Sequence, residues 1–160
     1  MLVGKNVTLV PCTNDLWHEI HRKYVPDPMM DETPYAYDFE RCEKAYNSRV
    51  ADVTRKYFAI LCNGDVIGDI YLKHIKADEK SAEFGIALID DSVKERGFGT
   101  EAIKLLIDYV FQELGLETIF ANSVIRNTRS QYVLEKLGFA YKNEDATFKY
   151  YKLEKSVCVF

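Results

Sequence analysis

Two kinds of hydrophobic pattern alternate along the chain and predict its elements. Short stretches rich in β-branched and apolar residues, bounded by proline, glycine or asparagine, indicate strands. We expect strands at residues 7–10, 56–62, 66–75, 81–89, 118–124, 139–142 and 147–153. Longer stretches with apolar residues at every third or fourth position indicate helices. We expect helices at residues 14–24, 39–50, 97–114 and 127–137.

Several of these helices begin at residues with capping side chains. Asn14 or Asp15 can cap the first helix, and Asp38 can cap the second. Asn127 or Thr128 can cap the last one. The predicted helix boundaries are therefore set by side-chain chemistry as well as by hydrophobic period.

Glycines mark two further boundaries. Gly138 suits the end of the last helix, because glycine readily adopts the left-handed conformation found just after a helix. Asn63-Gly64-Asp65 is a strong signal for the tight turn of a hairpin between the second and third strands.

The order of elements predicts the fold class. It is strand, two helices, three strands, helix, strand, helix and two strands. This order indicates a mixed α/β fold in which an antiparallel meander leads into a parallel crossover. We see no repeat, linker or break within residues 1–160 and expect a single domain. Ligands of such sheets bind at the carboxyl ends of the strands, where the strand order switches.

Composition and charge narrow the classes of function. Hydrophobic residues make up 48% and charged residues 29% of the chain, which is typical of a globular protein. A net charge of −4, without a block of lysine or arginine, argues against general nucleic-acid binding. Because apolar runs are short and the N-terminus lacks a signal-peptide pattern, we expect a cytoplasmic protein that does not associate with membranes. Four scattered cysteines without a Cys-x-x-Cys pair favour reduced thiols over a metal site.

Residues 94–101, with the sequence KERGFGTE, are the strongest candidate for a binding site. Gly97 and Gly99 stand at the entrance of the long predicted helix, where the first N–H groups lack partners within the helix. The helix dipole and the missing Cβ atoms suit this entrance to a phosphate or pyrophosphate. Two glycines alone are equally compatible with a simple tight turn. The loop lacks the Gly-Lys-Ser/Thr ending of a P-loop, which argues against a nucleoside triphosphatase.

Further motifs give the chain a family resemblance. The sequence KERGFGTEA, followed by Asn127-Thr-Arg-Ser130 and by LEKLGF at residues 134–139, resembles the GNAT N-acetyltransferase superfamily. Within it, GTEA and EKLGF are similar to the ribosomal-protein N-acetyltransferase branch. The element order matches over residues 3–153. The resemblance implies a mostly antiparallel central sheet, a parallel split between the fourth and fifth strands, and four flanking helices.

The resemblance also implies acetyl-CoA as cosubstrate. Loop amides would hold its pyrophosphate, the exposed backbone of the fourth strand would pair with its pantetheine arm, and the start of the last helix would contact it across the split. The implied cofactor-binding residues are Ala87, Leu88, Ile89, Lys94, Glu95, Arg96, Gly97, Phe98, Gly99, Thr100, Asn127, Arg129 and Ser130. The strand contact ends at Leu88 or at Ile89, depending on the direction of counting. A bulge within 81–89 would account for the extra residue.

Transfer of an acetyl group to an amine sets the chemistry. A free amine attacks a thioester, the oxyanion needs a hydrogen-bond donor, and the leaving thiolate must regain a proton. The resemblance suggests Ser130 as proton donor, with Tyr132 as a second candidate, and Glu83 could take the proton of the amine directly or through water. Each has a plainer interpretation. Ser130 could serve only first-turn amides, Tyr132 could be an ordinary packed or surface aromatic, and Glu83 could be a solvent-facing strand residue.

Three positions depart from the family pattern. Leu134 stands where many members have a tyrosine, Asn122 stands where some have a glutamate, and Lys94 stands where the first loop position is usually glutamine or arginine. Our first hypothesis is direct acetyl transfer from acetyl-CoA to a primary amine, either of a small molecule or of a protein N-terminus, in a ternary complex. Leu134 and Asn122 favour an alternative, a non-catalytic CoA-binding sensor or scaffold with the same fold.

The acceptor is indicated only by charge. Acidic residues gather around the first two helices at Asp27, Asp31, Glu32, Asp38 and Glu40. They favour a cationic amine, although such a run is also typical of a solvated loop. The apolar residues 155–160 would extend a strand or form a partner surface, such as that of a homodimer.

Overall fold

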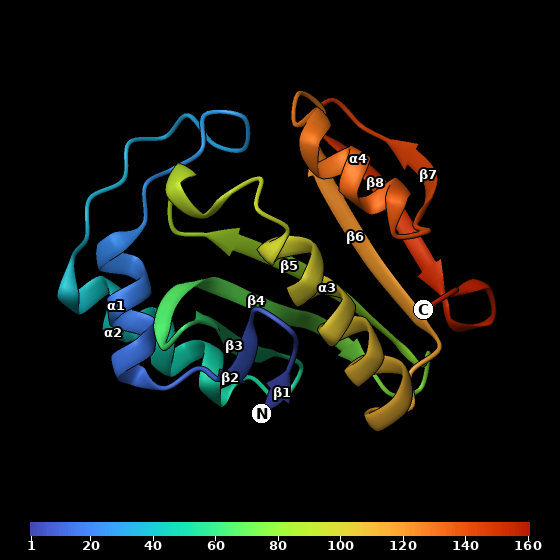
Figure 1. Ribbon diagram of the computed structural model, residues 1–160, viewed down its shortest axis with the longest axis horizontal. Coiled ribbons are helices and arrows are strands. Elements are labelled where there is room, and N and C mark those ends of the chain that lie inside the picture. Colours follow the sequence, from blue (N-terminus) through green and yellow to red (C-terminus); the bar gives the residue numbers. More distant parts are fainter.

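The computed structural model describes residues 1–160 and contains one eight-stranded sheet (Figure 1). The strands are β1 Leu2–Val3, β2 Thr8–Pro11, β3 Lys56–Cys62, β4 Asp65–Lys76, β5 Ser81–Leu88, β6 Thr118–Val124, β7 Ala140–Glu144 and β8 Phe148–Glu154. Their order is β1-β2-β3-β4-β5-β6-β8-β7. All neighbours are antiparallel except β5 and β6, which are parallel. The predicted mixed α/β fold with one parallel split is confirmed.

Four α-helices flank the sheet. They are α1 Asn14–Lys23, α2 Phe39–Ala51, α3 Phe98–Asp108 and α4 Thr128–Lys136. A carboxylate oxygen of Asp38 caps α2 as predicted. The side-chain amide oxygen of Asn127 caps α4, also as predicted. The N-cap of α1 is instead Thr13, whose hydroxyl accepts a hydrogen bond from the amide of Leu16, so the expectation of Asn14 or Asp15 is wrong. No helix has the length and apolar character required to cross a membrane.

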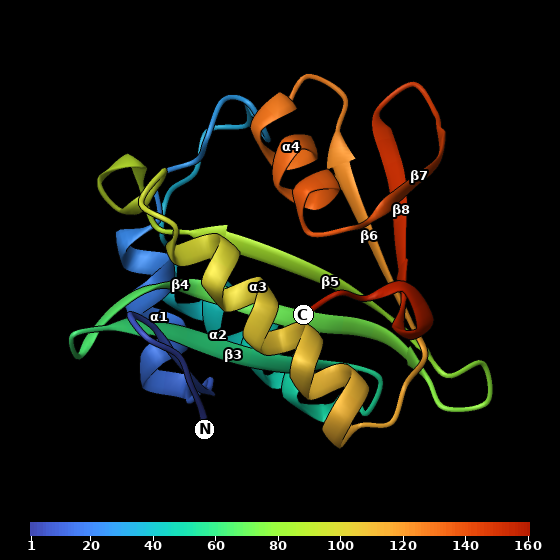
Figure 2. The ribbon, with the colours of Figure 1, turned by 45° about the vertical axis from the view of Figure 1, so that its right-hand side comes forward.

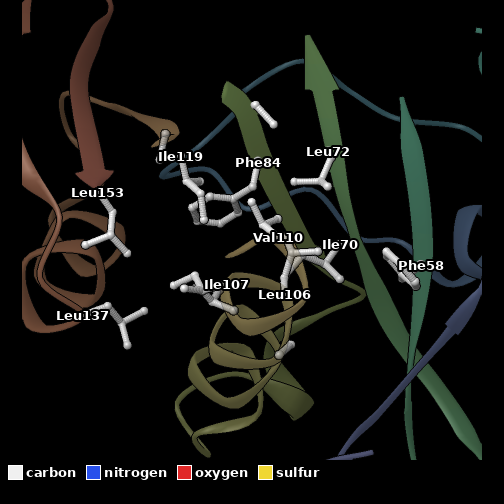
Figure 3. Close-up of a cluster of buried hydrophobic side chains, with 14 of the residues drawn as sticks. Phe58, Ile70, Leu72, Phe84, Leu106, Ile107, Val110, Ile119, Leu137 and Leu153 are labelled. Carbon is white, nitrogen blue, oxygen red and sulfur yellow. The ribbon is translucent and has the colours of Figure 1, made fainter. Parts of the chain in front are cut away.

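The main core lies between α3 and one face of the sheet (Figure 3). Side chains of β3, β4 and β5 alternate along each strand, and Ile60, Ile70 and Phe84 belong to the same buried cluster as the apolar residues of α3. Ala59, one residue from Ile60, faces the opposite way and packs with Ile20 of α1. The sheet is therefore a central layer with α3 on one side and α1 on the other (Figure 2).

The long predicted helix has a different C-terminal end. The buried face of α3 and its continuation holds the expected residues Ile103, Leu106, Ile107, Val110 and Phe111. However, the α-helix stops at Asp108 and continues as a π-helical turn over Tyr109–Glu113. Each hydrogen bond of a π-helix spans one residue more than that of an α-helix. The residues after the turn are therefore rotated about the helix axis, and Leu114 is only partly buried.

The expected bulge lies in the neighbouring strand. From Gly68↔Leu88 to Lys73↔Glu83 the pairing of β4 with β5 is regular, and it then shifts to Lys76↔Ser81. The extra residue therefore belongs to β4, where His74 has a φ of 51°, and not to the 81–89 segment. The prediction of a bulge within that segment is wrong.

The two ends of the chain also differ from expectation. Leu2–Val3 forms a short edge strand against Thr8 and Leu9 that the pattern did not indicate. At the other end, the expected strand extension by residues 155–160 is absent. Lys155–Val157 is a 3₁₀ turn, and the Lys104 ammonium lies 5.5 Å from the centre of the Phe160 ring, so the tail folds back onto α3.

Candidate functional site

A cleft opens where β5 and β6 separate. The two strands pair only at Ser81↔Thr118, Ala82↔Ile119 and Glu83↔Phe120, and they diverge beyond that point (Figure 1). The cleft has a volume of about 740 Å³. Consecutive β5 residues, Ile86 and Ala87, both line it although their side chains point to opposite faces of the sheet. The cleft therefore reaches both faces through the split.

The glycine loop forms one wall of this cleft. Gly97 has a φ of 83° and precedes α3, and no side chain caps the helix there. The first intrahelical hydrogen bond is donated by the amide of Glu101 to the carbonyl of Gly97. The amides of Phe98, Gly99 and Thr100 consequently have no partner in the helix and lie at its positive end. These three amides can therefore donate hydrogen bonds to an anion bound in the cleft.

An acidic loop after α1 crosses the mouth of the cleft. The Asp27 carboxylate lies 3.2 Å from Lys94 Nζ in the glycine loop and 3.2 Å from Arg129 in α4. Burial alone would raise the pKa of Asp27, but the amide of Met29 and the charges of Lys94 and Arg129 outweigh it and hold that pKa below its usual value. Arg129 also pairs with Glu95 at 3.1 Å. These contacts connect both sides of the split.

The start of α4 forms the opposite wall. Asn127 Oδ1 accepts a hydrogen bond of 3.2 Å from the amide of Ser130, and the buried Gln131 amide donates to the carbonyls of Val124 and Ile125. This arrangement turns Ser130 into the cleft. Tyr132 is two residues further around the helix and is 67% exposed. It does not line the cleft, so the structure gives no support to Tyr132 as a proton donor.

Glu83 occupies a polar cluster below the split. Its carboxylate accepts a hydrogen bond of 2.7 Å from the Asn122 side chain and lies 3.0 Å from His74 Nδ1 and 3.7 Å from Lys73 Nζ. Glu83 lines a separate, smaller hollow of about 490 Å³. Lys73 and Asn122, in contrast, line the main cleft. The carboxylate expected to accept the proton of the amine thus lies outside that cleft and is engaged with Asn122, His74 and Lys73.

The remaining groups give no indication of a metal centre. No cluster of three or more histidine, cysteine, aspartate or glutamate residues could hold a metal ion. Cys12, Cys42, Cys62 and Cys158 are all free thiols. Burial, with the nearby charge of Asp69, raises the pKa of Cys12 to about 12, so this thiol is not a ready nucleophile.

Residues 6–140 match the acetyltransferase (GNAT) domain family. This match covers most of the chain. The chain belongs to the GNAT acetyltransferase family.

Similar proteins share the fold of this GNAT chain. This chain is 29% identical to the spermidine N(1)-acetyltransferase of Escherichia coli K12 over 113 residues. The matched residues are 71% of this chain and 60% of that protein's length. A chimera of the Vibrio cholerae spermidine N-acetyltransferase SpeG with hSSAT superposes with a TM-score of 0.84, at 23% identity and over 95% and 97% of the two chains. The V. cholerae enzyme in complex with CoA and spermine gives 0.78, at 22% identity over 96% and 98%.

The GNAT cleft collects most of the residues expected to bind the cofactor. Those that line it are Ala87, Leu88, Lys94, Glu95, Gly97, Gly99, Thr100, Asn127, Arg129 and Ser130. Ile89 does not, because its amide donates to the carbonyl of Ile67 and its carbonyl accepts from the amide of Val25. Arg96 and Phe98 do not line it either, and the Arg96 guanidinium lies 5.2 Å from the centre of the Phe98 ring.

Sequence reasoning missed several residues on the other face of the cleft. Tyr71 and Lys73 of β4 and Phe148 of β8 line it, together with Tyr24 of the loop after α1. Alternation along β4 could have found the first two, since it places Asp69, Tyr71 and Lys73 on the face away from α3. No local pattern indicated Tyr24 or Phe148, which reach the cleft through tertiary packing.

Proposed function

We propose that this GNAT chain is an acetyl-CoA-dependent N-acetyltransferase that moves an acetyl group directly to a primary amine within a ternary complex. The observation that carries the proposal is the combination of two features in one cleft. Free helix-start amides at Phe98, Gly99 and Thr100 lie beside the β5 edge that β6 leaves unpaired. The first suits a pyrophosphate and the second suits the amides of an extended pantetheine arm.

The cofactor would be held mainly by backbone groups of this chain. Pyrophosphate oxygens would accept hydrogen bonds from the amides at the start of α3, with Lys94 and Arg129 adding positive charge nearby. The unpaired backbone at Gly85–Leu88 would align the thioester with the split. Acetyl-CoA supplies an activated acyl group, and the protein's task is to orient it toward the amine.

The acceptor would enter from the face that carries Tyr24, Met30, Asp31 and Lys73. Asp27 also lies there, but its charge is already paired with two cations. Asp31 forms no ion pair and is free to attract a cationic amine, as we inferred for the acidic loop. Polyamines are the first acceptors to test, because the E. coli and V. cholerae relatives are spermidine N-acetyltransferases.

Few side chains are available to move protons. Ser130 lines the cleft and its hydroxyl is the candidate to return a proton to the departing sulfur. Glu83 lies outside the cleft in three polar contacts, so we assign it no direct proton transfer. A small amount of free amine at neutral pH, oriented against the thioester, would then attack without a dedicated carboxylate in contact.

One assay tests this function. Purified protein is incubated with acetyl-CoA and a panel of polyamines, other small primary amines and basic peptides, and both thiol release and the acetylated product are measured. We expect amine-dependent thiol release with an equal amount of acetylated amine. No turnover with any acceptor class, despite acetyl-CoA binding, would contradict the proposal.

That negative result would support the second candidate, a non-catalytic CoA-binding sensor or scaffold. Leu134 is the observation that favours it. This side chain is 3% exposed and lines the cleft, so no hydroxyl is available at the position where many GNAT members carry tyrosine. Ser130 is one helical turn before Leu134 and is the only hydroxyl that α4 presents to the cleft.

A further inference from the structure

Tyr71 of β4 lies across the backbone of β5 at Gly85. A Cβ atom built on Gly85 would be 2.4 Å from both Cζ and the hydroxyl oxygen of Tyr71, closer than real atoms allow. The phenol therefore occupies the space that a side chain at position 85 would fill. Both residues line the cleft, and Gly85 is two residues beyond the last β5–β6 pair at Glu83. The hydroxyl is consequently located where the strands begin to separate.

The ring of Tyr71 is fixed from two sides. It stacks on Tyr57 of β3 with ring centres 4.9 Å apart and an angle of 22° between the planes, and its other contact is the backbone of Gly85. Tyr57 directs its own hydroxyl elsewhere and accepts a hydrogen bond of 3.0 Å from Arg55. The two stacked tyrosines thus differ in one respect. Only the Tyr71 hydroxyl faces the cleft.

Packing alone does not account for this hydroxyl. A phenylalanine would stack on Tyr57 and cover Gly85 equally well. No side-chain oxygen that is enclosed by protein lacks a hydrogen-bond partner, so the Tyr71 hydroxyl is open to the cleft unless a protein group bonds to it. The Tyr71 hydroxyl has no such partner, whereas the Tyr57 hydroxyl does. The free hydroxyl is explained if a group of the substrate completes its hydrogen bond.

The surroundings of the Tyr71 hydroxyl determine whether it donates or accepts this hydrogen bond. Burial, together with the nearby charges of Asp69 and Tyr57, raises the pKa of Tyr71 to about 12. The phenol therefore keeps its proton throughout the neutral range. It can donate a hydrogen bond to an oxygen that gains negative charge, and it cannot act as the base that deprotonates an amine.

We propose that Tyr71 is a catalytic residue that donates a hydrogen bond to the carbonyl oxygen of the acetyl thioester as this oxygen becomes an oxyanion. The proposal rests on the proposed acetyltransferase function. The amine nitrogen forms a bond to the carbonyl carbon with its lone pair, and the C=O π pair moves onto oxygen. When that pair returns, the C–S bond breaks and sulfur leaves with its electrons. Nitrogen loses one proton and sulfur gains one, while Tyr71 remains protonated throughout.

Tyr71→Phe tests this role, with Tyr57→Phe as the matched control. Both variants keep the stacked rings, and each removes one hydroxyl. We expect Tyr71→Phe to lower kcat and kcat/KM by the same factor of about 10²–10³, because the hydrogen bond is made to the transition state. Acetyl-CoA affinity and melting temperature should stay at wild-type values. Tyr57→Phe should keep kcat within about threefold of wild type, since its hydroxyl lies outside the cleft.

The outcomes separate this role from the proposed function. If the wild type turns over and Tyr71→Phe keeps its kcat, or if only KM changes, the catalytic role of Tyr71 is wrong. An equal loss in Tyr57→Phe would assign the effect to the aromatic stack and would also contradict the role. If the wild type acetylates no amine, the proposed function fails and this role fails with it.

Discussion

The Asp27 carboxylate lies 3.2 Å from the Lys94 ammonium and so connects the loop after α1 to the glycine loop. The same oxygen pairs with Arg129 of α4, on the far side of the split. Both cations are largely or partly buried against Asp27, whose side chain is 10% exposed. Removing Asp27 leaves Lys94 and Arg129 with only the exposed carboxylates of Asp91 and Glu95 as counter-charges.

Asp27→Asn should therefore lower the free energy of unfolding by about 1–3 kcal/mol at pH 7. Because the pKa of Asp27 is lowered in the folded state, its contribution is present above the unfolded pKa and is lost as the pH falls through the folded value. Urea unfolding at pH 7 measures the loss. Asp31→Asn, on the same loop without an ion pair, is the control and should change stability by less than about 0.5 kcal/mol. Equal stability of both variants would contradict the network.

Ser130→Ala tests the proton donor. The hydroxyl lines the cleft, whereas only the backbone amide of Ser130 takes part in the helix cap. We expect kcat to fall at least about tenfold, because general acids contribute on the order of 10²–10⁴-fold, with acetyl-CoA affinity nearly unchanged. Tyr132→Phe should retain full activity, since that side chain is 67% exposed and outside the cleft. If Ser130→Ala also retains full kcat, the thiolate takes its proton from water.

The buried carboxyl group of Asp69 should give the protein an unusual dependence of stability on pH. This side chain is 7% exposed, and burial raises its pKa from 3.8 to about 7 although the charge of Arg49 opposes the shift. Between about pH 4 and pH 7 the unfolded chain is ionised while the folded protein holds the proton. Asp69 therefore makes the protein less stable as the pH rises through this window, by up to about 4 kcal/mol.

Asp69→Asn removes this titration. Urea unfolding of wild type and variant at pH 5 and pH 8 should show a larger stabilising effect of the substitution at pH 8. The exposed Asp65 in the hairpin turn offers a control, because Asp65→Asn should have the same small effect at both pH values. A pH-independent difference for Asp69→Asn would show that its carboxylate is ionised in the folded protein.

Glu101, in the motif GTEA, holds the N-terminal segment onto α3. Its carboxylate accepts hydrogen bonds from the amides of Lys5 at 2.6 Å, Asn6 at 2.9 Å and Val7 at 3.1 Å. Glu101→Gln replaces one acceptor oxygen with a donor and should lower the free energy of unfolding by about 1–3 kcal/mol. Glu113→Gln, exposed at the end of the π-helical turn, should be near neutral. Equal unfolding midpoints would show that the anchoring is not needed for stability.

Local signals in the sequence predicted much of the fold for physical reasons. Lys56–Cys62 and Thr118–Val124 have the predicted bounds, because turn residues delimit each strand. Asn127 and Gly138 bound the last helix as expected, since one side chain accepts from Ser130 and the glycine has a φ of 96°. These signals act within a few residues, so a single sequence is sufficient to find them.

The errors arise where tertiary packing decides. The pattern could not tell that the extra residue falls in β4, or that the π-helical turn at Tyr109 rotates the end of the long helix. Nor could it show that Glu83 lies below the split while Tyr71 reaches across β5 at Gly85. Both residues are on strands with regular alternation. Which of them faces the cleft depends on where β5 and β6 separate.

Calorimetric titration of acetyl-CoA into the wild type and into Gly99→Val tests the assignment of the cleft most directly. A Cβ atom at Gly99 would make ordinary contacts of 3.7 Å with Leu88 and 3.8 Å with Ile86, so the fold tolerates it. The branched methyl groups would occupy the wall where the pyrophosphate must approach the helix amides. We expect binding by the wild type and its loss in Gly99→Val, with circular dichroism and melting temperature retained. Equal acetyl-CoA affinity in the folded variant would contradict the assignment of this cleft to the cofactor.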